Sequence, residues 1–320
     1  MLRKDSIFGP IRRLTKRDVD GDRNVWFRGI HMDKSIRRVK NRSALFLLPS
    51  VIGVALFFVL PFFVVIYYSM IDNPISGQFV FFDNFYNVLT NKAFQLAMLN
   101  TLRFSIIAVP LIIVLSLGLA FLLDKRVPGK SKIRAAFLSP MMVPVASVIL
   151  IWQVLFDYNG LLNELVQQFG GGKVDWLKSV YAQIVIVLLF VWKNLGYNMV
   201  LFMSALANIP REVVEVAELE SATKWQIFWR LKLRYLSSSI LFVTILSLIN
   251  SFKIFREVYL LTGDYPYETL YLLQHYMNNM FRSLDYQKLS AAAIIMSLVM
   301  IVLIGILFFA ENVLGKDLDG

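Results

Sequence analysis

Six long apolar runs constrain the fold of this 320-residue chain more than any other feature. About 20 apolar residues in a helix cross the hydrocarbon core of a bilayer, and each run reaches that length. Apolar side chains make up 57% of the chain and charged ones 17%, so six buried helices of a soluble protein are the weaker reading. We therefore expect an all-α integral membrane protein with six transmembrane helices. The runs are 44–70, 104–123, 135–156, 180–209, 238–261 and 289–310.

The distribution of Lys and Arg predicts the orientation of these helices. The segments outside the runs alternate between rich and poor, with 24 Lys and Arg in the rich set and 5 in the poor set. Because loops rich in Lys and Arg stay on the cytoplasmic side, both termini are expected in the cytoplasm. The rich segments are 1–43, 124–134, 210–236 and 311–320, and the poor ones are 71–96, 157–178 and 262–288.

The chain is expected to have three parts. A basic cytoplasmic tail covers 1–43, a six-span domain covers 44–310, and a short cytoplasmic tail covers 311–320. The first tail has 13 basic and 5 acidic residues, so we expect it to contact anionic headgroups of membrane lipids. Because the basic excess is mostly a topology signal, no nucleic-acid partner is expected.

Residues that catalyse reactions or bind metals are scarce in this sequence. The chain has no cysteine, and its two histidines, His31 and His275, are too far apart to form a metal-ligand motif. Gly129-Lys130-Ser131 ends like a phosphate-binding loop, but Asp124 stands where that motif needs a glycine. We therefore expect no catalytic residue, metal or cofactor in this chain. Transport is the leading interpretation, and a non-transporting membrane scaffold is the alternative.

The stretch 209–236 is too polar to span a membrane and too amphipathic to be an irregular loop. Residues 220–223 divide two apolar faces, and Thr223 is placed to cap a second helix. We predict two short helices on the cytoplasmic surface, with an ordinary interfacial hairpin as the alternative. The first face has Val213, Val214, Ala217 and Leu219, and the second has Trp225, Ile227, Phe228 and Leu231.

This stretch resembles the EAA loop of ABC importer permeases, whose pattern is E-A-A-x-x-D-G-A, followed by F and then I-x-L-P. Glu220 replaces the Asp of the pattern conservatively. Ser221 replaces its glycine, which indicates either a turn without positive φ or one that serine adopts with some strain. The matches in register are Glu215, Ala217, Ala222, Phe228 and Leu233, and the further departures are Val216, Leu231 and Arg234.

Other matches resemble the sugar branch of these permeases, the maltose or multiple-sugar type, and in particular the first permease of the pair, the maltose-permease-F-like subunit. They lie in the third run, in the helix that enters the EAA loop, and at the exit of the fifth run. They are Pro140, Pro144, Trp152, Phe156, Gly160 and Asn163; Trp192, Gly196, Tyr197, Asn198, Ile209 and Pro210; and Phe255, Tyr259, Leu261, Thr262, Gly263, Pro266 and Thr269.

The resemblance implies a permease subunit of an oligosaccharide importer in the bacterial inner (cytoplasmic) membrane. It implies a second homologous permease, an extracellular solute-binding protein, and two ATPase subunits that bind ATP and Mg²⁺. Each ATPase would receive one EAA helix, and Glu215 is our first choice for the anionic residue presented to it. A permease for a non-sugar solute is the alternative within transport. The other coupling residues implied are Ala217, Glu220, Ser221, Ala222 and Phe228.

Polar residues in the fourth and fifth runs are the candidates for the substrate pathway. A charged side chain at the centre of a membrane helix costs about 2.5–3.5 kcal/mol, so it usually faces a cavity or a partner. Tyr197 and Phe252 are candidates for an aromatic surface against a sugar ring. The candidate pathway residues are Lys193, Asn194, Tyr197, Asn198, Asn250, Lys253 and Arg256.

The charges among these residues suggest a substrate class. Lys253 and Glu257 stand four apart and are expected to neutralise one another, which leaves Lys193 and Arg256 in excess. A carboxylated sugar suits this excess, because charge-assisted hydrogen bonds are about twice as strong as neutral ones. We therefore hypothesise an acidic, uronate-containing oligosaccharide. Alternatively, the cations meet acids of the second permease or extend to the membrane interface.

Overall fold

The computed structural model describes residues 46–124 and 128–315. These residues are helical almost throughout, and none of them forms a strand longer than a single bridge. The chain divides into two compact units, 1–63 and 64–320, and each is described by itself. The predicted basic tail 1–43 and the last five residues of the predicted tail 311–320 lie outside the described part.

The described residues of the first unit, 46–63, form an apolar helix. Ala55–Val59 is a π-helical turn (η1), and the chain continues in helix α3, Leu60–Ser69. The large apolar side chains of this unit are exposed, with Phe46 at 86% and Phe57 at 73%. A surface of this kind requires lipid or a protein partner around it.

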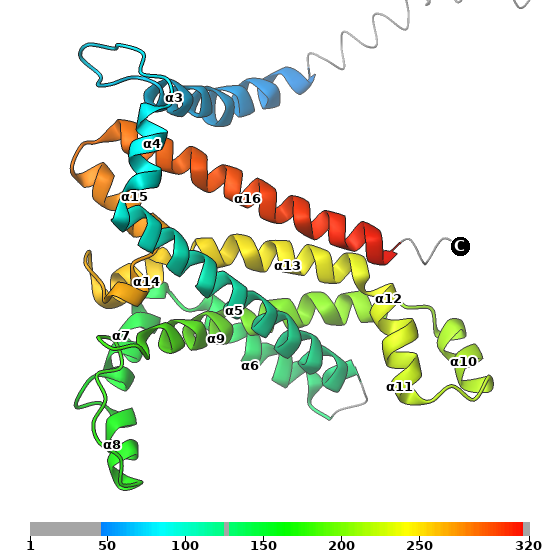
Figure 1. Cartoon of the computed structure of the whole chain (residues 1–320). Helices are drawn as coiled ribbons and strands as arrows, with labels where there is room; N and C mark the ends of the chain where they lie inside the picture. The colour runs from blue at the N-terminus through cyan, green and yellow to red at the C-terminus, as the bar shows by residue number, and fades with distance from the viewer. Residues whose placement is uncertain (1–45, 125–127, 316–320) are drawn as a thin grey trace, which may run out of the picture. The chain divides into compact units, whose positions relative to one another are not determined.

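The second unit contains the remaining helices, which Figure 1 labels in chain order. They are α4 Asp83–Thr90, α5 Lys92–Asp124, α6 Lys130–Met142, α7 Val145–Phe156, α8 Leu161–Gln168, α9 Ala182–Ala207, α10 Arg211–Leu219, α11 Lys224–Gln226, the π-helix η2 Ile227–Lys232, α12 Leu233–Tyr235, α13 Ser237–Phe252, α14 Phe255–Thr262, the 3-10 helix η3 Glu268–Leu270, α15 Leu273–Arg282 and α16 Tyr286–Gly315.

Among the described residues, six helical stretches are long and apolar enough to cross a membrane, as the sequence predicts. They are Phe46–Ser69, Lys92–Asp124, Val145–Gln168, Ala182–Ala207, Ser237–Thr262 and Tyr286–Asn312. The third stretch differs from the predicted run 135–156, because that run contains a break. Helix α6 ends at Met142, and α7 begins at Val145 after an extended Val143. Pro144 explains this break, since it lacks a backbone N–H and disfavours helical geometry in the residue before it.

The core of the second unit forms where α5 and α9 pack along each other and α13 lies along α5 (Figure 1). The rings of Phe104 on α5 and Phe190 on α9 meet edge to face, with centroids 5.5 Å apart. Helix α6 packs on α9 at Gly196, beyond Phe190 along the helix. A Cβ atom at Gly196 would lie 1.9 Å from the carbonyl oxygen of Phe137, so glycine is required for this close approach.

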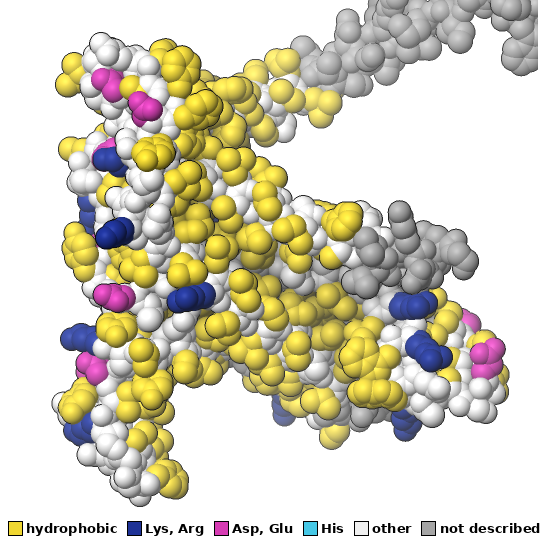
Figure 2. Space-filling model, in the orientation of Figure 1, with side chains coloured by type: hydrophobic (Ala, Val, Ile, Leu, Met, Phe, Trp, Pro, Cys, Tyr) yellow, Lys and Arg dark blue, Asp and Glu magenta, His cyan; other side chains and the backbone are white. Residues whose placement is uncertain are grey.

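Side chains on the surface of the second unit are distributed as lipid contact requires. Figure 2 shows hydrophobic side chains over α5, α13 and α16, while Lys, Arg, Asp and Glu gather at the two ends of these helices. On α16, Ile301, Val302 and Phe309 are exposed by 65%, 59% and 72%. This arrangement fits an apolar belt in the hydrocarbon core between two polar membrane surfaces.

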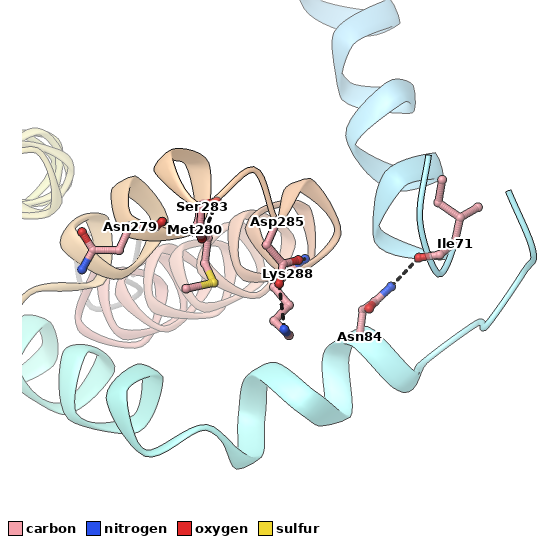
Figure 3. A network of polar contacts seen from close by, with 7 residues as sticks. All are labelled: Ile71, Asn84, Asn279, Met280, Ser283, Asp285 and Lys288. Atoms are coloured by element: carbon pink, nitrogen blue, oxygen red, sulfur yellow. Dashed lines mark hydrogen bonds and ion pairs between the residues drawn. The ribbon is translucent and has the colours of Figure 1, made fainter. Parts of the chain in front are cut away.

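The end of the second unit that is predicted to be extracellular is held by polar contacts (Figure 3). The Asn84 amide donates to the carbonyl oxygens of Ile71, at 2.8 Å, and Ser69, at 3.1 Å. Between α15 and α16, the Lys288 ammonium contacts the Asp285 carboxylate at 2.7 Å. The first set of contacts joins α4 to the end of α3, and the second lies at the start of α16.

Candidate coupling and substrate sites

The stretch that was predicted to form two short helices does so. Helix α10 is followed by a turn and then by a second helical segment that begins with α11, and both project from one end of the second unit (Figure 1). Thr223 caps α11, because its hydroxyl oxygen accepts from the N–H of Gln226 at 3.3 Å. In return, Gln226 Oε1 accepts from the N–H of Thr223 at 2.8 Å, which completes a capping box. The predicted cap is therefore confirmed. We call residues 211–235 the coupling segment.

The turn between the two helices has positive φ at Ser221, where φ is 60°. The N–H of Ser221 donates to the carbonyl of Glu218 at 3.1 Å, and the N–H of Ala222 donates to that of Ala217 at 3.0 Å. These two hydrogen bonds form a Schellman motif, which ends a helix with one left-handed residue, usually glycine. The sequence left two alternatives, a turn without positive φ and a turn that serine adopts with some strain. The structure has the second.

The second helix of the coupling segment is anchored to the end of α5. Ile227 is 6% exposed, and the ring of Phe228 packs on Phe121 with centroids 4.7 Å apart. The Lys232 ammonium lies 3.5 Å from the Asp124 carboxylate, the last residue of α5. Residues 227–232 form the π-helix η2, a rare geometry that is frequent at functional sites. The coupling segment therefore contacts α5 directly.

The outer surface of the coupling segment combines acids with large apolar side chains. Leu219 is 85% and Trp225 69% exposed, so these two members of the predicted apolar faces lie at the surface. The turn reverses the chain at Glu220, directly after Leu219, which leaves Leu219 outside the contact between α10 and η2. The predicted coupling residues Glu215, Glu220 and Ser221 are exposed, and Ala217, Ala222 and Phe228 are half-buried.

A cavity of about 440 Å³ lies between the coupling segment and the end of α5. Its lining is mostly apolar, and the charged residues in it are Asp124, Glu218, Lys224 and Lys232. Its lining includes Phe121, Val214, Trp225 and Phe228.

A buried ion pair joins the fourth and fifth spans. The Lys193 ammonium on α9 contacts the Glu257 carboxylate on α14, and their side chains are 18% and 5% exposed. The predicted pairing of Lys253 with Glu257 is therefore wrong. Helix α13 ends at Phe252, so Lys253 lies in a turn and is not one helical turn from Glu257. The sequence contains no local signal for the actual pair, because its members are 64 residues apart.

A cavity of about 120 Å³ surrounds this ion pair. It lies where α9 faces the junction of α13 and α14, and it gathers most of the predicted pathway residues. The Asn194 amide donates to the Phe190 carbonyl at 2.8 Å, which fixes its orientation. The lining consists of Phe190, Lys193, Asn194, Asn250, Lys253, Ile254, Arg256 and Glu257. We call this space the charged cavity.

Three predicted aromatic or polar candidates do not line the charged cavity. Asn198 is 1% exposed and donates to Ser247 at 2.8 Å, so it joins α9 to α13 inside the protein. Tyr197 is half-buried outside the lining, and Phe252 is 4% exposed in an apolar cluster. Phe190 was not predicted, although its place three residues before Lys193 puts it on the same helix face.

No group of three or more His, Cys, Asp or Glu side chains able to hold a metal ion occurs among the described residues. His275 on α15 is 1% exposed and packs against the ring of Phe255. Burial lowers the pKa of His275 to about 4, so the ring is neutral at pH 7. Its Nδ1 accepts from the N–H of Leu272 at 3.2 Å, which gives the residue a structural role at the start of α15.

Residues 112–319 match the family described as "Binding-protein-dependent transport system inner membrane component". The chain is 26% identical to the osmoprotective compounds uptake permease protein GgtC of Synechocystis, over 80% of this chain and 94% of that one. It is 29% identical to the trehalose/maltose transport system permease protein MalF of Thermococcus litoralis, over 73% and 83%. It is 28% identical to the lactose transport system permease protein LacF of Rhizobium radiobacter, over 73% and 80%.

The fold is similar to that of a chain in a solved bacterial ABC transporter involved in the import of the acidic polysaccharide alginate. The TM-score is 0.75 at 20% sequence identity, over 87% of this chain and 97% of that chain. A second structure of the alginate transporter, in complex with a periplasmic protein bound to an alginate pentasaccharide, gives the same TM-score. At this identity the similarity establishes the shared fold.

Proposed function

The chain belongs to the family of inner membrane components of binding-protein-dependent transport systems, and from this premise we propose that it is the permease subunit of an ATP-driven oligosaccharide importer. Two of the relatives named above are permeases for trehalose, maltose or lactose. The charged cavity carries the proposal, since it places the amides of Asn194 and Asn250 between two spans. Such donors suit the hydroxyl groups of a sugar.

The substrate class is tested by uptake into cells that have or lack this chain. We expect the chain to be required for uptake of an oligosaccharide. One relative is a permease for osmoprotective compounds, which makes such compounds the relevant comparison. Loss of osmolyte or amino-acid uptake, with oligosaccharide uptake unchanged, would establish a non-sugar permease instead.

The proposed complex contains this chain, a second homologous permease, two ATPase subunits and an extracellular solute-binding protein. ATP and Mg²⁺ are bound by the ATPase subunits. The coupling segment is the surface that contacts an ATPase, and three features support this role. It projects from the helix ends, it exposes Glu215, Leu219 and Trp225, and η2 fastens it to α5 through Phe228 and the Lys232–Asp124 pair. Closure of the ATPase dimer would thus move the spans between inward-facing and outward-facing states.

Charge reversal at Glu215 tests the coupling role. We expect Glu215→Lys to leave membrane insertion intact while it reduces copurification of the ATPase and sugar uptake. The matched control is Glu164→Lys, which makes the same change at an exposed residue of α8. Normal ATPase copurification and normal uptake in Glu215→Lys would exclude this residue from the contact.

We also propose that both termini lie in the cytoplasm. The excess of 24 over 5 Lys and Arg supports this orientation. The geometry of the second unit agrees with it, because residues of the segments predicted to be cytoplasmic, and Ser238 at the adjoining end of the fifth run, meet at one end. Lys232 lies 3.5 Å from Asp124, and the Ser238 hydroxyl lies 3.1 Å from the Glu311 carboxylate.

A further inference from the structure

We propose that the transported oligosaccharide carries carboxylate groups, and that Arg256 and Lys253 bind them in the charged cavity. This inference rests on the proposed function and names its substrate as a uronate-containing oligosaccharide. It follows from how the charges of the cavity are paired.

Among the described residues, Glu257 is the one carboxylate that lines the charged cavity, and it is already engaged. Glu257 is held by Lys193, which reaches it from a different span, and its side chain is 5% exposed. This pair is internal to the protein and joins α9 to α14. Glu257 therefore does not fully neutralise the two remaining cations of the cavity, Lys253 and Arg256.

Those two cations retain most of their binding capacity. Arg256 Nη2 lies 3.5 Å from Glu257 Oε1, at the outer limit of a hydrogen bond, and its side chain is 66% exposed. A guanidinium has five N–H donors, so this contact leaves the others free for a ligand. Lys253 is exposed in the turn between α13 and α14, and its ammonium has no ion pair within the described residues.

The ion pair of Lys193 and Glu257 lies well away from the ends of the spans. Lys193 is the twelfth of the 26 residues of α9, which places it about 16 Å along the helix, near its middle. Arg256 remains at this depth because its guanidinium is within 3.5 Å of the same carboxylate that Lys193 contacts. A side chain that extended to the membrane interface would have left Glu257.

A neutral sugar does not account for cations at this depth. The amides of Asn194 and Asn250 also line the cavity and suffice for hydroxyl groups. Charged groups at membrane depth cost about 2.5–3.5 kcal/mol each, and a carboxylate ligand offsets this cost with charge-assisted hydrogen bonds. An arginine beside a lysine and an amide is therefore the arrangement expected for a sugar acid.

The test uses the complete transporter in proteoliposomes, with its partner permease, ATPase subunits and binding protein. The probes are oligouronates from several hydrolysed polyuronides, and the same oligosaccharides after reduction of their carboxyl groups to alcohols. Each pair shares its sugar stereochemistry and differs in charge. We expect wild-type transporter to take up at least one oligouronate and to prefer it to its reduced counterpart by about tenfold or more.

Variants then assign this preference to the cavity. Arg256→Gln and Lys253→Gln should each lower oligouronate uptake about tenfold more than they lower uptake of the reduced sugars. Arg256→Lys should keep most of the uptake, because it keeps the charge. Lys173→Gln, which removes an exposed lysine outside the cavity, should change neither.

Five results would overturn the inference. Uptake of reduced sugars alone would do so and would leave the proposed sugar permease intact. If Arg256→Gln lowers uptake of oligouronates and of reduced sugars equally, Arg256 serves assembly. Loss of the second permease from the purified Arg256→Gln complex would show the same. Normal oligouronate uptake in both glutamine variants would exclude Arg256 and Lys253. Uptake of neither set would contradict the inference and the sugar permease together.

Discussion

Ser221 occupies a backbone conformation that costs free energy for any residue with a Cβ atom. Its φ of 60° is in the left-handed region, where a non-glycine residue is less stable by about 1–2 kcal/mol. The Schellman hydrogen bonds from Ser221 and Ala222 hold it there. Leu284 shows that this is not unique to the coupling segment, because it has the same φ of 60° at the end of α15. Both turns therefore retain a geometry that their own side chains oppose.

We predict that Ser221→Gly stabilises the coupling segment by about 1 kcal/mol, because glycine adopts positive φ without strain. Hydrogen exchange of the amides of α10 and α11 in the purified protein measures this change. Ser297→Gly is the control, since Ser297 lies within α16 and glycine there should cost about 0.5 kcal/mol. Faster exchange of α10 in Ser221→Gly would contradict the strain at this position.

At the scale of helices, Gly196 determines how closely α6 and α9 pack. We predict that Gly196→Ala destabilises the protein by about 1–3 kcal/mol, because its Cβ would meet the Phe137 carbonyl oxygen at 1.9 Å. Gly305→Ala on α16 is the matched control. Outside the adjacent backbone of α16, no described atom lies within 4 Å of a Cβ at that position, so the change should be neutral or stabilising. Thermal unfolding in detergent compares the two variants, and equal midpoints would contradict the close helix contact.

What the sequence predicts about these elements depends on the range of the interaction. Run length alone predicts the six spans, and a local capping pattern predicts Thr223 at the start of α11. The ends of α6 and α13 are harder to predict. Each lies inside a predicted apolar run, one next to Pro144 and the other next to Lys253, so run length does not mark it. The Lys193–Glu257 pair depends on how α9 packs against α14, and no pattern within one helix encodes that contact.

For the whole molecule, the orientation in the membrane is the property on which every functional role depends. We predict that reporters fused after Lys92 and Lys173 lie outside the cell and that reporters after Gly129 and Lys224 lie in the cytoplasm. The reason is the asymmetry of 24 against 5 Lys and Arg. Alkaline phosphatase activity reports the outside positions, and a cytoplasmic reporter tests the others. A cytoplasmic signal after Lys173 would contradict the proposed arrangement of the spans.

The central claim is that this chain forms half of a pathway through which ATP drives sugar import. The most direct measurement is uptake of a labelled oligosaccharide by proteoliposomes that contain the complete transporter, with ATP present or absent on the ATPase side. We predict accumulation above the external concentration only when ATP and the loaded binding protein are both present. Uptake that equilibrates without ATP, or that proceeds without the binding protein, would contradict the account.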